Sequence, residues 1–257
     1  MNILADSVVW ITGGGSGIGA AGARALAEAG ATVVVSGRRR EELERVVGTI
    51  RETGGHAEAA VLDVTDEPAV RRTAAAILEA HGRIDTLVAS AGLNLPNRSF
   101  QSLGPGDWAR LVDVNLNGAM HAIQAALPSM RERRSGTIIL ISSWVGRHAV
   151  RLGGPGYNAT KQALVALGHS LNMEECGNGL RACVIMPGEV ETDFLTQRAA
   201  PPPPDELARL LRPDDLGRTI RFVAEMPPHV CVNEILISPT WNRNFLPPAP
   251  AAAAASV

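Results

Sequence analysis

The sequence predicts an α/β fold: one doubly wound domain whose seven-stranded parallel sheet carries helices on both faces. Short runs of β-branched and aliphatic residues alternate along the chain with longer segments of helical period. Alternation of this length is typical of right-handed βαβ units, which place their strands in parallel. No Ser/Gly linker, charge block or change of composition divides the chain before about residue 245. We therefore expect a single domain over residues 1–246.

The elements follow one another in a regular order. A strand is expected wherever a short apolar run occurs, and these runs lie at 7–12, 32–36, 57–62, 86–90, 137–142, 181–186 and 233–238. A helix is expected wherever apolar residues recur at helical spacing, at about 17–29, 40–53, 67–81, 107–133, 157–177 and 214–226. The third helix also has a start signal, because Asp66 can cap it and Pro68 suits its first turn.

Two segments depart from this alternation. Residues 189–212 contain four consecutive prolines and stand between the sixth strand and the sixth helix. A connection at that place crosses the carboxyl ends of the strands, so we expect a substrate lid there. Residues 247–257 hold prolines and five alanines with few large apolar groups, and we expect this tail to be disordered.

Composition excludes several classes of function. Hydrophobic residues make up 46% and charged residues 19%, and the formal net charge of -2 gives no reason to expect nucleic acid or a membrane surface as a partner. No apolar run approaches the length of a membrane span. Three cysteines without CxxC spacing and six scattered histidines favour reduced core thiols, no metal site and a cytoplasmic location.

The only tyrosine of the chain, Tyr157, precedes Lys161 by four residues. One helical turn separates them, so both side chains share a face. A neighbouring ammonium favours the phenolate and lowers the phenol pKa toward neutral pH, which would suit proton transfer. Such a pair also occurs by chance on helix surfaces, and only its context makes it a catalytic candidate.

A glycine-rich turn follows the first strand directly. It contains Gly13, Ser16, Gly17, Ile18 and Gly19, and a helical pattern begins there. Glycines let backbone N–H groups approach a pyrophosphate at the positive end of a helix. Glycine-rich turns are common, but a strand before, a helix after and a second strand ending near residue 36 favour a dinucleotide site.

The end of the second strand indicates which nucleotide binds. An acidic residue there would accept hydrogen bonds from the adenosine ribose, but the sequence has Ser36, Gly37 and then arginines from Arg38 to Arg40. Guanidinium groups suit a ribose 2′-phosphate, so NADP(H) is favoured over NAD(H), with Arg38 as the binding residue. The alternative is that these arginines are solvated residues at the start of the second helix.

Separated motifs agree in order and spacing with one family. Over residues 5–240 the chain resembles a classical short-chain dehydrogenase/reductase, which implies a Rossmann-type domain. The motifs that carry the resemblance are the glycines of 12–19, Asp63 with Val64, Ala91 with Gly92, Asn115, Ser143 with Tyr157 and Lys161, and 187–192 with Val190 and Thr192.

The resemblance implies a role for each catalytic residue. Tyr157 would exchange a proton with the substrate oxygen while hydride passes between the substrate and the nicotinamide. Lys161 would lower the Tyr157 pKa and bind the nicotinamide ribose, and Ser143 would hydrogen-bond the substrate oxygen. Asn115 would kink its helix and hold a water that links Lys161 to solvent. Ser142 offers an alternative hydroxyl, although strand alternation points it to the opposite face from Ser143.

The resemblance also implies the cofactor contacts. Asp63 would accept from the adenine amino group beside Val64, Ala91 and Gly92 would follow the adenosine side, and Val190 and Thr192 would meet the nicotinamide carboxamide. Ser90 stands where the family usually has Asn, which implies weaker ties between strands. The last strand lacks the usual Asp-Gly-Gly ending and resembles the branch with 3-hydroxy acid and serine dehydrogenases.

We therefore expect an NADP(H)-dependent oxidoreductase that interconverts a secondary alcohol and a ketone, with a hydroxy acid among its candidate substrates. The alternative is a catalytically silent regulatory or scaffold protein that binds a nucleotide. The family implies a homo-oligomer, a tetramer or a dimer, paired through 107–133 and 157–177. The expected pocket walls are Asn94, Ser143, Trp144, His148, Leu152, Glu189, Phe194 and Leu195, and His148 could contact a carboxylate or remain an exposed loop residue.

Overall fold

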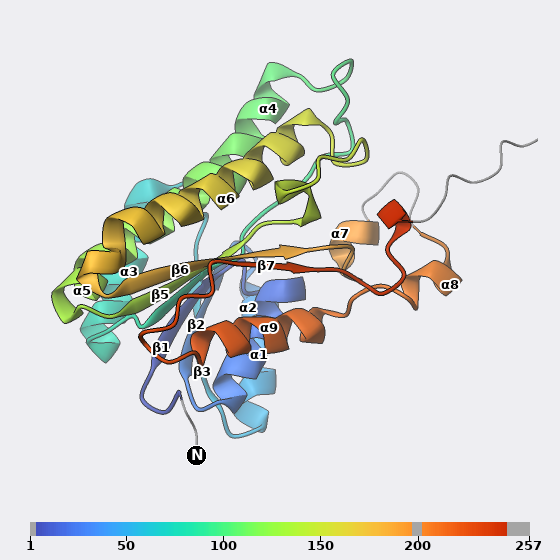
Figure 1. Ribbon diagram of the computed structural model, residues 1–257. Helices are drawn as coiled ribbons and strands as arrows, with labels where there is room; N and C mark the ends of the chain where they lie inside the picture. The colour runs from blue at the N-terminus through green and yellow to red at the C-terminus, as the bar shows by residue number, and fades with distance from the viewer. Residues whose placement is uncertain (1–3, 197–201, 246–257) are drawn as a thin grey trace, which may run out of the picture.

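A twisted parallel sheet runs through the centre of the computed structural model, which describes residues 4–196 and 202–245 (Figure 1). The strand order is β3-β2-β1-β4-β5-β6-β7, and every neighbouring pair is parallel. This confirms the predicted fold class. The seven strands are β1 (Val8–Thr12), β2 (Thr32–Gly37), β3 (His56–Val61), β4 (Thr86–Ala89), β5 (Gly136–Ile141), β6 (Leu180–Pro187) and β7 (Glu234–Ile237).

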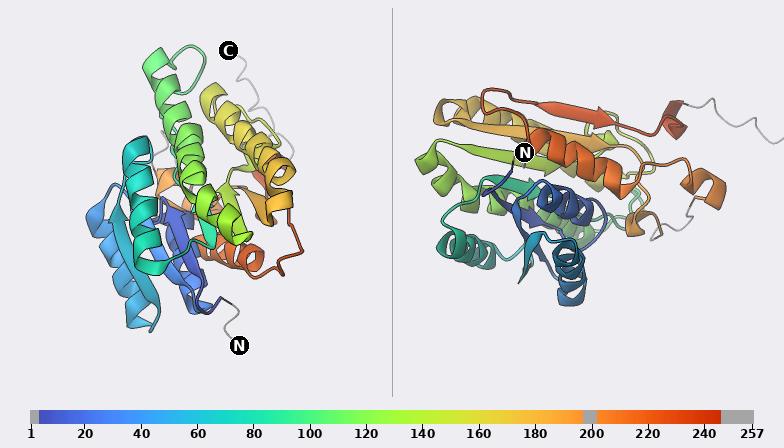
Figure 2. Two further views of the ribbon diagram at one scale, coloured as in Figure 1. Left: turned by 90° about the vertical axis from the view of Figure 1, so that its left-hand side faces the viewer. Right: turned by 90° about the horizontal axis from the view of Figure 1, so that it is seen from below.

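Helices cover both faces of the sheet, as the two views of Figure 2 show. One layer consists of α1 (Gly17–Glu28), α2 (Arg40–Glu52) and α9 (Pro213–Ala224), and the other of α3 (Glu67–His81), α5 (Gly118–Arg133) and α6 (Pro155–Glu175). The chain order reverses between β1 and β4, since the sheet grows from β1 in both directions. In such sheets a crevice opens at this point beyond the carboxyl ends of the strands.

The core has two halves, one on each side of the sheet. Alternate residues of β1 face opposite layers: Val9 and Ile11 join the cluster under α1, α2 and α9, while Val8 and Trp10 join the cluster under α3, α5 and α6. Both faces are covered, so the strand is apolar at every position before its last residue, as is usual for parallel sheets. The one polar atom of Trp10 is satisfied, because its indole nitrogen donates to Ser36 Oγ at 2.8 Å.

The predicted helix over 107–133 differs in the structure. It consists of α4 (Pro105–Val112) and α5 (Gly118–Arg133), with a π-helical segment, Asp113–Asn117, between them. A π turn is one wide turn within a continuous helical run, so the sequence on both sides of it still has the pattern of a helix. The other predicted helices and strands lie within a few residues of their expected bounds, and α6 begins two residues earlier than predicted.

The expected lid region has some regular structure of its own. It holds the short helices α7 (Asp193–Thr196) and α8 (Pro204–Leu207), and a parallel bridge joins Val190 to Leu211 at its base. Residues 197–201 of this region lie outside the described residues. So does the tail 247–257, which was the segment predicted to be disordered. Within the described part of the chain, no helix is both long and apolar enough to cross a bilayer.

Candidate active site

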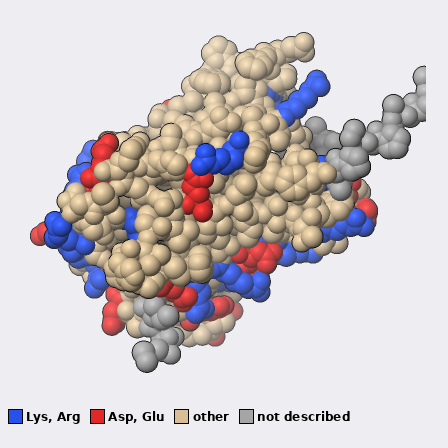
Figure 3. All heavy atoms as spheres, in the orientation of Figure 1, with Lys and Arg blue, Asp and Glu red and all other residues tan. Residues whose placement is uncertain are grey.

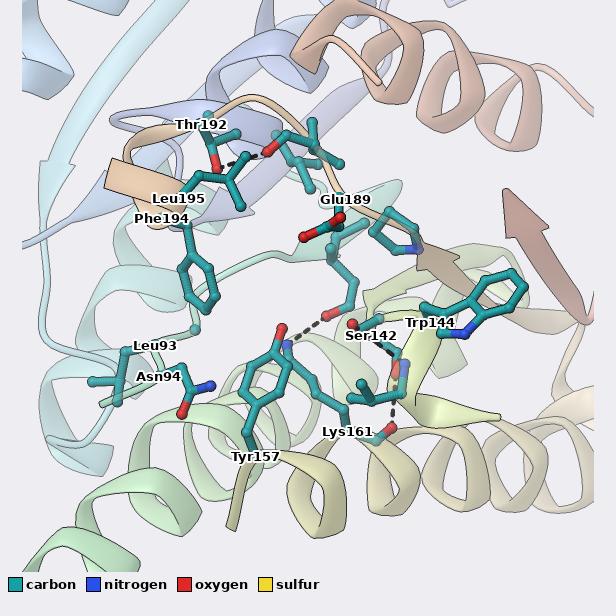
Figure 4. A pocket seen from close by; sticks show the side chains of 18 of the residues that line it. Leu93, Asn94, Ser142, Trp144, Tyr157, Lys161, Glu189, Thr192, Phe194 and Leu195 are labelled. Atoms are coloured by element: carbon teal, nitrogen blue, oxygen red, sulfur yellow. Dashed lines mark hydrogen bonds between the residues drawn. The ribbon is translucent and has the colours of Figure 1, made fainter. Parts of the chain in front are cut away.

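A cavity of about 740 Å³ opens at the carboxyl ends of the strands (Figure 4). Its volume lies in the range of ligand-binding sites. The glycine-rich turn after β1 forms one end, and further lining residues come from the loops after β2, β4 and β5, the start of α6, residues 187–195 and the segment after β7. The parallel sheet thus brings together segments that are far apart in the sequence.

The glycine-rich turn has the shape that a nucleotide phosphate requires. Gly13 has a φ of 70°, and a Cβ on it would lie 2.7 Å from the Ala91 nitrogen. A Cβ on Gly19 would lie 2.3 Å from the Gly13 oxygen. The first turn of α1 carries no acidic residue, so its positive end is open to an anion. The residues of this turn therefore fit a dinucleotide pyrophosphate.

Two arginines, rather than one, line the cavity beyond the end of β2. Arg38 lies there as predicted, and Arg39 lies beside it. The Arg39 side chain crosses toward the glycine-rich turn, where its Nη2 donates to Ser16 Oγ at 3.4 Å. Among the three arginines at 38–40, only Arg38 was predicted as the binding residue. The proximity of Arg39 to Ser16 depends on how the β2–α2 loop folds over the turn.

Asp63 and Val64 do not line the cavity. The Asp63 carboxylate accepts from the Thr65 backbone at 3.0 Å and from its hydroxyl at 2.8 Å. Burial opposes ionisation of Asp63, but these bonds and the Arg38 charge together hold its pKa below the ordinary range. Val64 is buried, and its carbonyl oxygen lies 2.9 Å from His121 Nδ1. An adenine contact by either residue stays a prediction.

Tyr157 and Lys161 lie one turn apart near the start of α6 and both line the cavity. The Lys161 ammonium lies 5.7 Å from the centre of the Tyr157 ring. Lys161 is buried, and its Nζ donates to the Ile141 oxygen at 2.8 Å. Burial lowers the pKa of Lys161 to about 8. It is also the only lysine in the sequence, so the chain has one phenol and one side-chain amine, adjacent in one cavity.

The two serines after β5 have different surroundings. Ser142 is buried, and its hydroxyl donates to the Lys161 carbonyl oxygen at 2.7 Å. Ser143 is only partly buried, and its hydroxyl accepts weakly from the Val145 nitrogen at 3.4 Å. The Ser142 hydroxyl is therefore engaged in holding α6, while the Ser143 hydroxyl is available to a ligand in the cavity.

Asn115 lies fully buried in the π-helical segment. Its Oδ1 accepts from the Leu93 nitrogen at 2.8 Å, and its Nδ2 donates to the Leu93 oxygen at 2.9 Å. Nδ2 also lies 3.2 Å from the Thr160 hydroxyl, one residue before Lys161. Where a kink at Asn115 was predicted, the structure has a π-helical segment. Asn115 itself does not line the cavity but ties the loop after β4 to α6.

The other expected walls are present, with one exception. Asn94, Trp144, Leu152, Glu189, Phe194 and Leu195 all line the cavity, and the Phe194 ring lies 5.8 Å from that of Tyr157. His148 does not line the cavity, and its ring packs against that of Trp144, with the two ring centres 4.8 Å apart. Sequence reasoning missed Arg98, Val150, Arg243 and Asn244, because their place depends on loop paths that no motif marks.

No cluster of metal-ligating side chains occurs in the part of the chain that the structure describes.

The fold and the cavity together define a Rossmann-type protein with a dinucleotide site beside a Ser, Tyr and Lys constellation. Residues 7–202 match the family model for short chain dehydrogenases. The chain belongs to the short-chain dehydrogenase/reductase family, in its classical form, and the family consists of oxidoreductases that bind NAD(P).

Individual relatives agree with this assignment. An uncharacterized oxidoreductase of Listeria innocua is 33% identical over 244 residues, covering 92% of this chain and 98% of the relative. The crystal structure of a metagenomic short-chain oxidoreductase in complex with NADP is 31% identical, with a TM-score of 0.81 over 93% of this chain and 99% of that one. An alcohol dehydrogenase from the archaeon Thermococcus sibiricus, complexed with 5-hydroxy-NADP, is 29% identical, with a TM-score of 0.83 over 92% and 98%.

Proposed function

We propose that this oxidoreductase uses NADP(H) to interconvert a secondary alcohol and a ketone. The observation that carries the proposal is that Ser143, Tyr157 and Lys161 line the same cavity as the glycine-rich turn. A dinucleotide whose pyrophosphate meets the turn can then extend toward these three side chains. When bound, NADP(H) would supply the hydride for reduction or accept it during oxidation.

The residues of the chain would handle the proton. In reduction, the Tyr157 hydroxyl gives its proton to the substrate oxygen, and Ser143 donates a hydrogen bond to the same atom. The Lys161 ammonium, 5.7 Å from the ring centre, stabilises the phenolate that remains. With its pKa at about 8, Lys161 is mostly protonated at pH 7, so this stabilisation is present there. Oxidation runs the same proton transfer in reverse.

Asn115 helps to hold Tyr157 and Lys161 in place. Its hydrogen bonds to Leu93 and Thr160 join the loop after β4 to the helix that presents Tyr157 and Lys161. In this proposal, Asn115 also orders a water that connects Lys161 to solvent. Ser142 holds the same helix through the Lys161 carbonyl.

The preference for NADP(H) is part of the proposal. Arg38 and Arg39 line the cavity where a ribose 2′-phosphate would lie, and the Arg39 contact with Ser16 brings a guanidinium close to the glycine-rich turn. Two solved structures similar to this chain were obtained with NADP or 5-hydroxy-NADP.

We expect Arg38→Asp to reduce the ratio of kcat/KM for NADPH to that for NADH by about tenfold or more, since it replaces an attractive charge by a repulsive one. An unchanged ratio would show that Arg38 does not read the phosphate.

The decisive experiment compares the wild type with Tyr157→Phe. Both proteins are titrated with NADPH and then assayed with a panel of ketones, secondary alcohols and hydroxy acids. We expect the variant to bind NADPH within a few-fold of the wild type and to lose about 10²–10⁴-fold in kcat, as is usual when a general acid is removed. Full activity in the variant would contradict the mechanism. Nucleotide binding without turnover in the wild type would favour a silent regulatory protein.

A homo-oligomer, as a tetramer or a dimer, is also proposed. The face that carries α6 and β7 shows few charged side chains in Figure 3. Met173 on α6 is 73% exposed, and Leu236 on β7 is 43% exposed. Apolar side chains on a face with few charges are typical of surfaces that pair. Light scattering of the purified protein would give the molar mass and test this part of the proposal.

A further inference from the structure

The segment 238–245, which follows β7, forms the outer wall of the cavity. It lies beside α7 at the carboxyl ends of the strands (Figure 1). Arg243 and Asn244 line the cavity from this segment. The Phe245 ring meets the Trp144 ring edge-to-face, with centres 5.4 Å apart. The segment therefore lines the cavity and also packs against Trp144, in the loop after β5.

Arg243 connects this segment to two parts of the expected lid. Its Nε and Nη2 donate to both carboxylate oxygens of Glu189, at 2.7 and 2.6 Å. Its Nη1 donates to Glu206 on α8 at 3.1 Å. A bidentate pair of this kind fixes orientation as well as distance. One guanidinium thus holds the first residue of the lid and its second short helix at once.

The backbone on both sides of these contacts is also held. The Gly188 nitrogen donates to the Ile237 oxygen at 2.7 Å, and the Leu211 nitrogen donates to the Glu189 oxygen at 3.1 Å. A second link runs between the same two segments, because the Arg209 guanidinium lies 5.3 Å from the centre of the Trp241 ring. The main chain of Glu189 is therefore anchored, and Arg243 determines where its carboxylate lies.

That carboxylate points into the cavity. Figure 4 shows Glu189 across the cavity from the Tyr157 hydroxyl, with Phe194 between them on one side. The Glu189 and Glu206 side chains are only 20% and 27% exposed, so water screens their pairs with Arg243 less than it screens an open surface pair. A substrate whose oxygen lies at Tyr157 would extend its remaining part toward the wall that Glu189 and Arg243 form.

We propose that Arg243 is a positioning residue that sets the size of the substrate. It holds Glu189 and α8 in place, and the wall that Glu189 and Arg243 form limits how far a ketone or alcohol can extend from Tyr157. The inference rests on the proposed function and adds a determinant outside the family's motif residues. Without the guanidinium, Glu189 and Glu206 lose a shared partner, and the wall can move outward. Short substrates then lose their contact with the wall, whereas bulky substrates gain room.

The test compares Arg243→Met with a matched control, Arg221→Met. Arg221 also pairs with a glutamate, Glu225 at 2.7 Å, but on α9 and away from the cavity. Methionine keeps an unbranched side chain while it removes the charge. The measurements are kcat and KM for a short methyl ketone and for an aryl ketone of the same reactivity, the affinity for NADPH, and hydrogen exchange of peptides covering 202–212.

For Arg243→Met we expect KM for the short ketone to rise about tenfold or more, because this substrate loses its contact with the wall and binds more weakly. The preference for the short over the aryl ketone should fall, exchange in 202–212 should quicken, and NADPH affinity should stay within about twofold. Glu206→Gln should change the same quantities in the same direction but less. The Arg221→Met control should match the wild type.

Other results would overturn the inference. If the wild type is active and Arg243→Met keeps its KM and its substrate preference, the positioning role is wrong while the proposed function stands. An equal loss for both ketones together with weaker NADPH binding would show general loosening, and would also refute it. If the wild type turns over no substrate in the panel, the proposed function fails and this inference fails with it.

Discussion

Replacing Lys161 by methionine should stabilise the cofactor-free protein at neutral pH while it removes activity. The buried ammonium donates to the Ile141 oxygen, but that bond does not replace the hydration that the charge loses on folding. Methionine has a similar length and no charge, so it fills the same space without this cost. The residue proposed to promote proton transfer is thus predicted to weaken the fold.

The magnitude follows from the pKa. Burial lowers the pKa of Lys161 from 10.5 to about 8. A difference of about 2.5 pKa units corresponds to about 3 kcal/mol, at 1.36 kcal/mol per unit. Loss of the hydrogen bond to Ile141 offsets this stabilisation by about 1 kcal/mol. We therefore expect the free energy of unfolding of Lys161→Met to exceed that of the wild type by about 2 kcal/mol at pH 7.

The sign of the pH dependence is fixed by the direction of the shift. Between the two pKa values the unfolded chain binds more protons than the folded one, so wild-type stability rises as the pH increases from about 8 to 10.5. The variant lacks this titration. Its advantage should therefore be largest below pH 8 and should shrink steadily above it, while titrating groups that do not interact with Lys161 are common to both proteins and cancel in the difference.

Two assays check this prediction. Urea unfolding of both proteins at pH 7 and pH 9.5, with equal m values, gives the difference in stability. Since Lys161 is the only lysine, NMR of protein labelled only at lysine gives one side-chain signal, whose titration reports its pKa directly. A variant that is less stable at pH 7, or an advantage that does not change with pH, would refute the reasoning. So would a lysine signal that titrates near 10.5, the ordinary value.

The remaining predictions concern the glycine-rich turn and the serines. Gly19→Ala should abolish NADPH binding as measured by fluorescence titration, because its Cβ would lie 2.3 Å from the Gly13 oxygen; retained affinity would mean that the turn can relax. Ser142→Ala should lower the unfolding free energy by about 1 kcal/mol, since it removes a buried hydrogen bond to Lys161, with little change in kcat. Ser143→Ala should do the opposite, with an unchanged melting temperature and a loss of about 10²-fold or more in kcat; the reverse pattern would exchange the roles of the two serines.

The fold could be predicted almost completely from the sequence. The strands at the centre of the sheet are apolar on both faces, as β1 shows with Val8, Val9, Trp10 and Ile11, and this pattern is typical of a covered parallel sheet. The π-helical segment at Asn115 could not be read in the same way. A wide turn changes the hydrogen-bond pattern of a helix but hardly changes which residues are apolar, and periodicity reports only the latter.

Site residues were predictable where a helix, a strand or a recognised motif fixes their place. They were not predictable where their place depends on the path of a loop. Tyr157, Lys161 and the glycines are placed by regular elements, and their neighbours in the cavity follow from the order of the sheet. Arg39 and Arg243 enter through irregular segments, whose paths depend on tertiary contacts such as those with Ser16 and Glu189. The buried Thr12 hydroxyl, at the end of β1, has no partner among the described residues. The weaker ties expected at Ser90 stay a prediction.

The Asn115 side chain makes the hydrogen bonds that the backbone of a paired β residue would make. Its amide exchanges two hydrogen bonds with Leu93, one accepted at 2.8 Å and one donated at 2.9 Å, which is the pairing that two residues of a β ladder make with their backbones. Aspartate has the same shape but can only accept, so it would face the Leu93 oxygen with a second acceptor. Leucine would offer neither bond. The π turn thus lets a helix pair with the loop after β4, and this pairing requires an amide at that position.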